Sequence, residues 1–300
     1  MADELEFDEY AAAGAKRKRP SRGMFVLPSL FTAANIAAGY YAITQSIQGT
    51  VADPAYFDRA ALAIGAAVVC DGLDGLVARM THTTSDFGKE LDSLADVITF
   101  GLAPSLLAYI WGFRMLPATV HPALRGNVLH AGIFACFLFL ICGASRLARF
   151  NISVNPQPRN PGKPGRKYFV GMPIPAGAGV VAAVVHCFRG SPIYDPRISL
   201  LWLVLVLFAG FLMVSSWRFW SAKEITSGRK QPFQLFALIA LIGALIAWNS
   251  ELMLMVIALG YLVSGVLARL AYGWGRSRRR IHPPEPVDVK ARPDAKSASD

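Results

Sequence analysis

Long apolar runs alternate with short polar segments along most of this chain. Each run is close to the roughly 20 residues that an α-helix needs to cross a bilayer. The runs lie at about 24–47, 60–80, 91–113, 128–150, 168–187, 198–216, 232–248 and 252–270. The pattern predicts an all-α fold, a polytopic membrane helical bundle of about eight transmembrane helices.

The polar segments predict a division of the chain into four parts. Residues 1–23 form a polar tail, and residues 24–217 form a core of six membrane helices. Two further membrane helices occupy 218–272, and the basic, proline-rich end at 273–300 has the composition of a disordered tail.

Composition and charge support a membrane protein over a soluble one. Hydrophobic residues make up 54% of the chain, which is too apolar for an ordinary soluble domain. The net charge of +10 comes largely from basic segments on one side of the expected membrane, beginning at Lys16. Such asymmetry marks cytoplasmic loops and contact with anionic lipids, so we expect membrane lipids and no nucleic acid as partners. It places the segment between the second and third runs at the cytoplasmic face of the inner membrane.

Four aspartates flank that segment. Asp71 and Asp74 are three residues apart, and Asp92 and Asp96 are four apart, so each pair shares one face of a helix. The polar break between the pairs allows the two helices to form a hairpin that brings the carboxylates together. A single aspartate here would be interpreted as a helix cap or a surface residue, but four on matching faces favour a site.

The aspartates are suitable ligands for divalent cations. A charge at the centre of a membrane helix costs about 2.5–3.5 kcal/mol, so clustered carboxylates need a compensating cation. Oxygen ligands without His or Cys suit Mg²⁺, Mn²⁺ or Ca²⁺. Four carboxylates can hold two ions about 3.5–4 Å apart, an arrangement that typically binds a diphosphate during phosphoryl transfer.

A second group of polar residues lies in other runs. Arg146 and Arg149 are three apart at the cytoplasmic end of the fourth run, where they predict a site for a phosphate or carboxylate. The alternative is that both arginines only extend to the membrane surface. Asn35 lies in the middle of the first run, and polar residues there usually face the protein interior.

The fifth run contains residues that disfavour a regular helix at its start. Gly171, Pro173 and Pro175 predict an irregular backbone there. Non-helical backbone at membrane depth is tolerated where it lines a cavity.

The aspartate segment resembles the signature of the CDP-alcohol phosphotransferases, D-x2-D-G-x2-A-R-x8-G-x3-D-x3-D. Its non-acidic positions are filled by Gly75, Ala78, Arg79 and Gly88. The RLARFN and FVGMPIPAGAG segments, and LFTAANIAAGYYAI around Asn35, are similar to the bacterial phosphatidylserine synthases of this family. The resemblance covers about residues 25–185, more than half of the chain.

The resemblance implies a reaction and roles for the residues. A phosphatidyl group passes from CDP-diacylglycerol to the hydroxyl of L-serine, and CMP leaves. Two ions, Mg²⁺ or Mn²⁺, are implied, one on Asp71, Asp74 and Asp92 and the other on Asp71, Asp92 and Asp96. Asp96 is the implied base for the serine proton. The implied substrate-binding residues are Asn35, Gly75, Ala78, Arg79, Gly88, Arg146 and Arg149, of which the two glycines, Ala78 and Arg79 shape the CDP pocket.

Two other interpretations remain open at the level of sequence. The same signature serves enzymes that use another alcohol, such as glycerol 3-phosphate, inositol phosphate or choline. A cation transporter is a non-enzymatic alternative, but it would need acidic residues along several spans, and the other runs are nearly free of them. We also expect the protein to be a homodimer.

Overall fold

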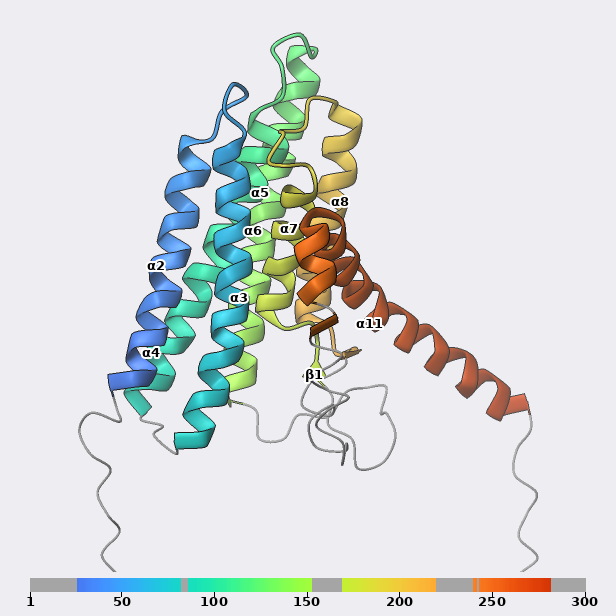
Figure 1. Cartoon of the computed structure of the whole chain (residues 1–300). Coiled ribbons are helices and arrows are strands. Elements are labelled where there is room, and N and C mark those ends of the chain that lie inside the picture. Colours follow the sequence, from blue (N-terminus) through green and yellow to red (C-terminus); the bar gives the residue numbers. More distant parts are fainter. Residues whose placement is uncertain (1–25, 82–85, 153–168, 220–239, 242, 282–300) are drawn as a thin grey trace, which may run out of the picture.

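The chain folds into a bundle of helices, shown by a computed structural model in Figure 1. The structure describes residues 26–81, 86–152, 169–219, 240–241 and 243–281. The main helices are α2 (Val26–Gln48), α3 (Ala55–Thr81), α4 (Asp86–Asp96), α6 (Pro122–Ile152), α7 (Ile174–Cys187), α8 (Pro196–Val214) and α11 (Ser250–Ile281). The structure confirms that the chain is predominantly helical and that it has helices able to span a membrane.

Several helices have the length and composition of membrane spans. Within the described ranges four qualify: Phe87–Arg114, Pro122–Ile152, Pro196–Val214 and Ser250–Tyr272. The helix Ile174–Cys187 is apolar but shorter. The total of about eight spans stays a prediction, because α2 (Val26–Gln48) and α3 (Ala55–Thr81) are not among these four helices and most of the expected run at 232–248 lies outside the described residues.

The third expected span is one continuous but irregular helix. After α4 the chain continues as a π-helical turn η2 (Val97–Leu102), then α5 (Ala103–Tyr109), then a second π-helical turn η3 (Ile110–Arg114). Such widened turns are frequent at functional sites. Here η2 begins directly after Asp96, so the backbone changes its geometry at the last of the four aspartates.

A close approach of backbones joins α2 to η2. A Cβ atom on Gly39 would lie 2.9 Å from the Cα atom of Thr99 and 2.5 Å from its hydroxyl oxygen. Glycine therefore permits a contact between α2 and η2 that a larger residue would prevent. This contact brings the middle of α2 beside the end of α4.

The fifth expected span begins irregularly, as its glycine and prolines predict. Residues 169–170 form β1 (Phe169–Val170), which pairs in antiparallel register with β2 (Arg218–Phe219). Gly171 has a φ angle of +76°, and Pro173 is the N-cap of α7. The pairing of β1 with β2 was not expected from the sequence.

Buried aromatic residues fill the middle of the bundle. Phe57, Phe100, Phe113 and Phe139 are fully buried, whereas large apolar side chains such as Leu201 are exposed on the outside of the bundle. An apolar exterior of this kind suits a protein embedded in lipid. We infer a membrane-embedded protein from these features together with the apolar helices.

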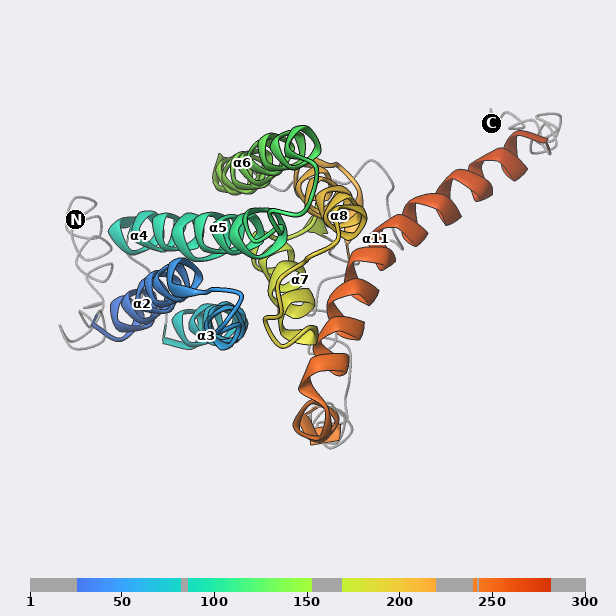
Figure 2. The ribbon, with the colours of Figure 1, turned by 90° about the horizontal axis from the view of Figure 1, so that it is seen from above.

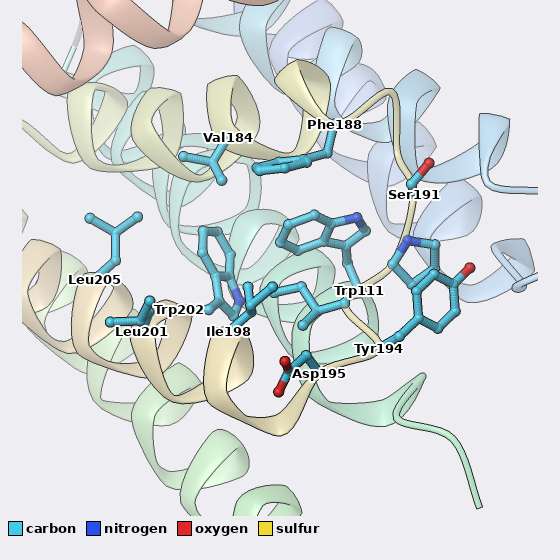
Figure 3. A pocket seen from close by; sticks show the side chains of 12 residues that line it. Trp111, Val184, Phe188, Ser191, Tyr194, Asp195, Ile198, Leu201, Trp202 and Leu205 are labelled. Carbon is cyan, nitrogen blue, oxygen red and sulfur yellow. The ribbon is translucent and has the colours of Figure 1, made fainter. Parts of the chain in front are cut away.

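An apolar cavity of about 440 Å³ lies between the end of α7 and α8 (Figure 3). Trp111 and Trp202 form part of its wall with their rings edge to face, 5.1 Å apart between centroids. Each indole N–H donates to a backbone carbonyl, that of Trp111 to Gly190 and that of Trp202 to Ala108. These bonds satisfy the polar edges of the two rings inside an otherwise apolar region.

The helix α11 begins beside α7 and then extends away from the bundle, as the view from above shows (Figure 2). It continues to Ile281, past the boundary expected at residue 273. The basic residues at 276–280 therefore belong to a helix in this structure.

Candidate functional site

Three of the four predicted aspartates come together. Asp71 lies on α3, and Asp92 and Asp96 lie on α4. One carboxylate oxygen from each residue lies within 4.8 Å of the other two. The structure thus joins two parts of the signature that are separated by a polar break in the sequence.

Four other signature positions lie on α3. Asp74, Gly75, Ala78 and Arg79 continue the helical backbone after Asp71, but their side chains lie outside the described part of the structure. Their roles at the site remain predictions. Gly88 is in the first turn of α4 and is half-buried.

The carboxylate cluster, which comprises Asp71, Asp92 and Asp96, is well suited to divalent cations. Asp96 is only 8% exposed, and the other two residues are half-buried. Because three carboxylates this close repel one another and lose hydration, they need positive charge between them. All the donors are carboxylate oxygens, the ligands preferred by Mg²⁺ and Mn²⁺.

Asn35 joins the cluster from α2. Its side-chain amide donates to Oδ1 of Asp96 over 3.5 Å, and it is 3% exposed. The hydroxyl of Thr99 donates to the backbone carbonyl of Asn35 over 2.8 Å. The prediction that Asn35 faces the protein interior is confirmed, and its amide helps to orient Asp96.

Thr99 was missed by the sequence interpretation. It lies three residues after Asp96 and so belongs to the same side of the chain. That spacing was a usable signal, because a hydroxyl next to a buried carboxylate often bonds a neighbouring polar group.

Arg146 on α6 brings a positive charge to the carboxylate cluster. It is 7% exposed and interacts electrostatically with Asp96 and with Tyr261. Its guanidinium carbon lies 5.6 Å from the centre of the Phe150 ring. Its Nε atom is buried without a hydrogen-bond partner among the described residues. The side chain of Arg146 is therefore held inside the bundle.

Arg149 makes different contacts from Arg146. Its Nη1 donates to the carbonyl of Val214 over 2.9 Å, and Nη2 lies 3.4 Å from the carbonyl of Ser215. These are carbonyls at the end of α8, which lack partners within the helix. Arg149 thus stabilises a helix end, and its predicted role in binding substrate stays a prediction.

Two more residues complete the surroundings of the site. The side-chain amide of Asn151 donates to the hydroxyl of Ser93 over 2.8 Å, which ties the end of α6 to α4. Tyr261 on α11 interacts electrostatically with Arg146. No sequence signal pointed to Tyr261, because α11 lies beyond the segment that resembles the family.

Comparison with known proteins gives a consistent result. The family model described as CDP-alcohol phosphatidyltransferase matches residues 25–195. A CDP-diacylglycerol–serine O-phosphatidyltransferase of Helicobacter pylori is 36% identical over 249 residues, which is 83% of this chain and 92% of that protein. Proteins of the same name from Bacillus subtilis and Saccharomyces cerevisiae are 32% and 34% identical. The match to the Bacillus protein covers 69% of this chain and 99% of that protein. The match to the yeast protein covers 55% of this chain and 55% of that protein.

Proposed function

We propose a reaction and a mechanism for this chain, which belongs to the CDP-alcohol phosphatidyltransferase family. It transfers the phosphatidyl group of CDP-diacylglycerol to the hydroxyl of L-serine, giving phosphatidylserine and CMP. The observation that carries the assignment to serine is the similarity to serine enzymes over most of the chain. The cluster of three carboxylates beside a buried arginine supports the chemistry.

The aspartates are proposed as metal ligands. We assign Asp71, Asp74 and Asp92 to one divalent ion, and Asp71, Asp92 and Asp96 to a second, with Mg²⁺ or Mn²⁺ as the metal. Bound ions would neutralise the diphosphate and the charge that develops as CMP leaves. The proximity of three of the four carboxylates supports this assignment.

Asp96 is proposed as the general base. It lies at the buried end of the cluster, and Asn35 holds one of its oxygens. A fixed carboxylate can accept the proton of the serine hydroxyl as the oxygen attacks phosphorus. Thr99 supports this geometry indirectly, since its hydroxyl fixes the backbone of Asn35.

The remaining signature residues are proposed to bind the nucleotide. Gly75, Ala78 and Gly88 are small, so CDP can approach the helix backbones of α3 and α4 closely. Arg79 would pair with a phosphate oxygen of CDP.

Arg146 is proposed to bind the anionic group that distinguishes serine, or the phosphate of the lipid. A buried guanidinium with an unpartnered Nε needs a hydrogen-bond acceptor. A carboxylate or phosphate provides that acceptor in a bidentate geometry that suits Arg. Arg149 is proposed to lie next to this anion site without binding the anion as Arg146 does, because its side chain donates to a carbonyl at the end of α8.

The setting of the enzyme is also a proposal. The apolar runs favour about eight spans. The basic segments favour an orientation in the inner membrane with the aspartates facing the cytoplasm. Membrane lipids would surround the apolar exterior, and two copies would form a homodimer.

A panel of acceptors tests the function. Membranes containing the chain are given CDP-diacylglycerol with serine, glycerol 3-phosphate, inositol phosphate or choline, and CMP release and the lipid product are measured. We expect product with serine and none with the others, and an Asp71→Asn variant provides the inactive control. Product with another alcohol would overturn the serine assignment, and no CMP release with any alcohol would overturn the chemistry.

A further inference from the structure

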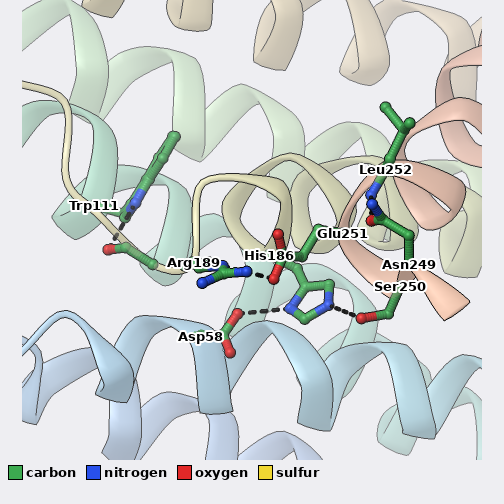
Figure 4. Close-up of polar contacts among 9 residues, drawn as sticks. Asp58, Trp111, His186, Arg189, Asn249, Ser250, Glu251 and Leu252 are labelled. Carbon is green, nitrogen blue, oxygen red and sulfur yellow. Dashed lines mark hydrogen bonds and ion pairs between the residues drawn. The ribbon is translucent and has the colours of Figure 1, made fainter. Parts of the chain in front are cut away.

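A second group of polar residues lies far from the carboxylate cluster. Nδ1 of His186 lies 2.6 Å from Oδ1 of Asp58, and Nε2 of the same ring lies 2.9 Å from the hydroxyl oxygen of Ser250 (Figure 4). Asp58 is thirteen residues before Asp71 on the same helix, which corresponds to about 20 Å along its axis. The two groups are therefore separate sites.

In the neutral form of His186, the two partners define which ring nitrogen carries the hydrogen. A carboxylate can only accept, so Nδ1 of a neutral His186 carries the hydrogen that Asp58 accepts. Nε2 is then the acceptor for the hydroxyl hydrogen of Ser250. A serine bonded to an imidazole, which is itself oriented by a carboxylate, is the arrangement of an activated nucleophile.

Three different helices supply these side chains. Asp58 comes from α3, His186 from α7 and Ser250 from the first residue of α11. His186 is 7% exposed, whereas Asp58 and Ser250 are half-buried. A nearby ion pair between Arg189 and Glu251, 2.7 Å long, joins the end of α7 to α11 at the same place (Figure 4).

An apolar cavity reaches this group. It has a volume of about 550 Å³ and lies between α3, α7 and α11. His186 is part of its wall, and so are Ile246 and Leu254, which bracket Ser250 in the chain. A cavity with almost entirely apolar walls that ends at a polar group suits a long acyl chain with an ester at one end.

We propose that Ser250, His186 and Asp58 form a second catalytic site that hydrolyses carboxylic esters of fatty acids. The hydroxyl oxygen of Ser250 bonds to the ester carbonyl carbon, and its proton moves to Nε2 of His186. The ester C–O bond then breaks, and the alcohol leaves with that proton. Water next attacks the acyl-serine, giving its proton to Nε2, and the fatty acid departs as Ser250 recovers its hydrogen.

The start of α11 provides a donor for the developing oxyanion. Amide N–H groups in the first turn of a helix have no carbonyl partner within that helix. Glu251 follows Ser250 in this first turn, so its backbone N–H belongs to the residue next to the nucleophile. The N-terminal end of a helix also favours negative charge.

A covalent probe tests the proposal with the full-length chain in detergent. The chain is incubated with an alkyl fluorophosphonate in EDTA, so that no divalent metal contributes, and the modified residue is identified by peptide mass spectrometry. We expect modification of Ser250 and none in Ser250→Ala. His186→Gln and Asp58→Asn should each slow modification by about 10²–10⁴-fold, the usual contribution of a general base.

A matched control and a second readout complete the test. Ser264→Ala changes a half-buried serine on the same helix. In this variant the probe should modify Ser250 at the wild-type rate. Hydrolysis of p-nitrophenyl esters should improve with acyl length by about fourfold for each methylene that enters the cavity. CMP release from CDP-diacylglycerol and serine reports whether each variant is folded.

Two results would overturn the proposal. One is the absence of modification at Ser250 in the wild-type chain, and the other is an unchanged rate in a folded His186→Gln variant. Either would show that these three side chains only attach α11 to α3 and α7.

Discussion

At the scale of single residues, Asp96 has the most constrained surroundings in the carboxylate cluster. It is buried, accepts from Asn35 and interacts with Asp71, Asp92 and Arg146. The proposed function assigns two roles to this residue, metal ligand and general base. These two roles can be separated by measuring binding and turnover independently.

We expect Asp96→Asn to lose turnover more than binding. The amide keeps the size of the side chain and its contact with Asn35 but cannot accept a proton, so kcat should fall by about 10²–10⁴-fold. Single-turnover release of CMP and equilibrium binding of CDP-diacylglycerol measure the two effects. Asp53→Asn, at an exposed position, is the control. Near wild-type kcat in Asp96→Asn would assign the base to another group.

Arg146 and Arg149 should respond differently to the same substitution. Arg146→Lys removes the planar group beside the cluster, so we expect the KM for serine, or for CDP-diacylglycerol, to rise about ten- to a hundred-fold, the value of a hydrogen bond to a charged group. Arg149→Lys loses bonds to α8, so we expect a lower Tm with a smaller change in KM.

Serinol provides the matching test on the substrate side. It lacks the carboxylate that Arg146 is proposed to bind, so the wild-type chain should use it poorly. Unchanged KM in Arg146→Lys together with equal use of serinol and serine would contradict an anion site at this position.

At the scale of elements, the site depends on how α2 meets the irregular helix that follows α4. Gly39 allows the backbone of η2 to approach α2, and this approach lets Thr99 bond the carbonyl of Asn35. Substitution of Gly39 therefore affects both packing and the orientation of Asp96.

We expect Gly39→Ala to lower the Tm of the purified protein. A new Cβ would lie too close to Thr99, and overpacking of this kind costs about 1–3 kcal/mol. Gly126→Ala is the matched control, because nothing lies within 4 Å of a Cβ there and alanine favours a helix. A Tm for Gly39→Ala at or above the wild-type value would contradict the close approach.

The carboxylate cluster joins α3 to α4, so metal dependence is also a property of these elements. We expect EDTA to abolish CMP release and Mg²⁺ or Mn²⁺ to restore it, because the clustered carboxylates repel one another without a cation. The assay is CMP release before and after chelation and after addition of each metal. Full activity in EDTA would contradict the metal assignment.

At the scale of the whole molecule, the carboxylate cluster and the Ser250 group lie at different heights along α3, with Asp58 in its first turn and Asp71 in its second half. If the basic segments face the cytoplasm, the two groups face different sides of the membrane. The orientation of the bundle therefore determines which water-soluble molecules can reach each group.

Cysteine labelling tests that orientation. A cysteine at Ser85, in the segment between α3 and α4, should react with an impermeant reagent only from the cytoplasmic side. A cysteine at the exposed Ser191 should react only from the opposite side. The wild-type chain controls for its own cysteines, of which Cys136 is buried and the others are half-buried. The reverse pattern would invert the proposed topology.

The amino-acid sequence by itself determined the class of the protein and the central chemistry. Runs of membrane-span length predict helices because the bilayer sets the length and excludes unpaired backbone. The spacing of Asp92 and Asp96 predicts a shared face because a helix has a fixed period. The irregular start of α7 follows from Gly171 and Pro173 because their backbone preferences are local.

Only the tertiary structure decided the contacts between distant segments. Arg146 and Arg149 share a helix face, yet the first lies beside Asp96 and the second bonds the end of α8. The pairing of β1 with β2, and the meeting of Asp58, His186 and Ser250, join residues many positions apart in the chain. Local periodicity describes one helix at a time, whereas these contacts depend on how whole helices pack against one another.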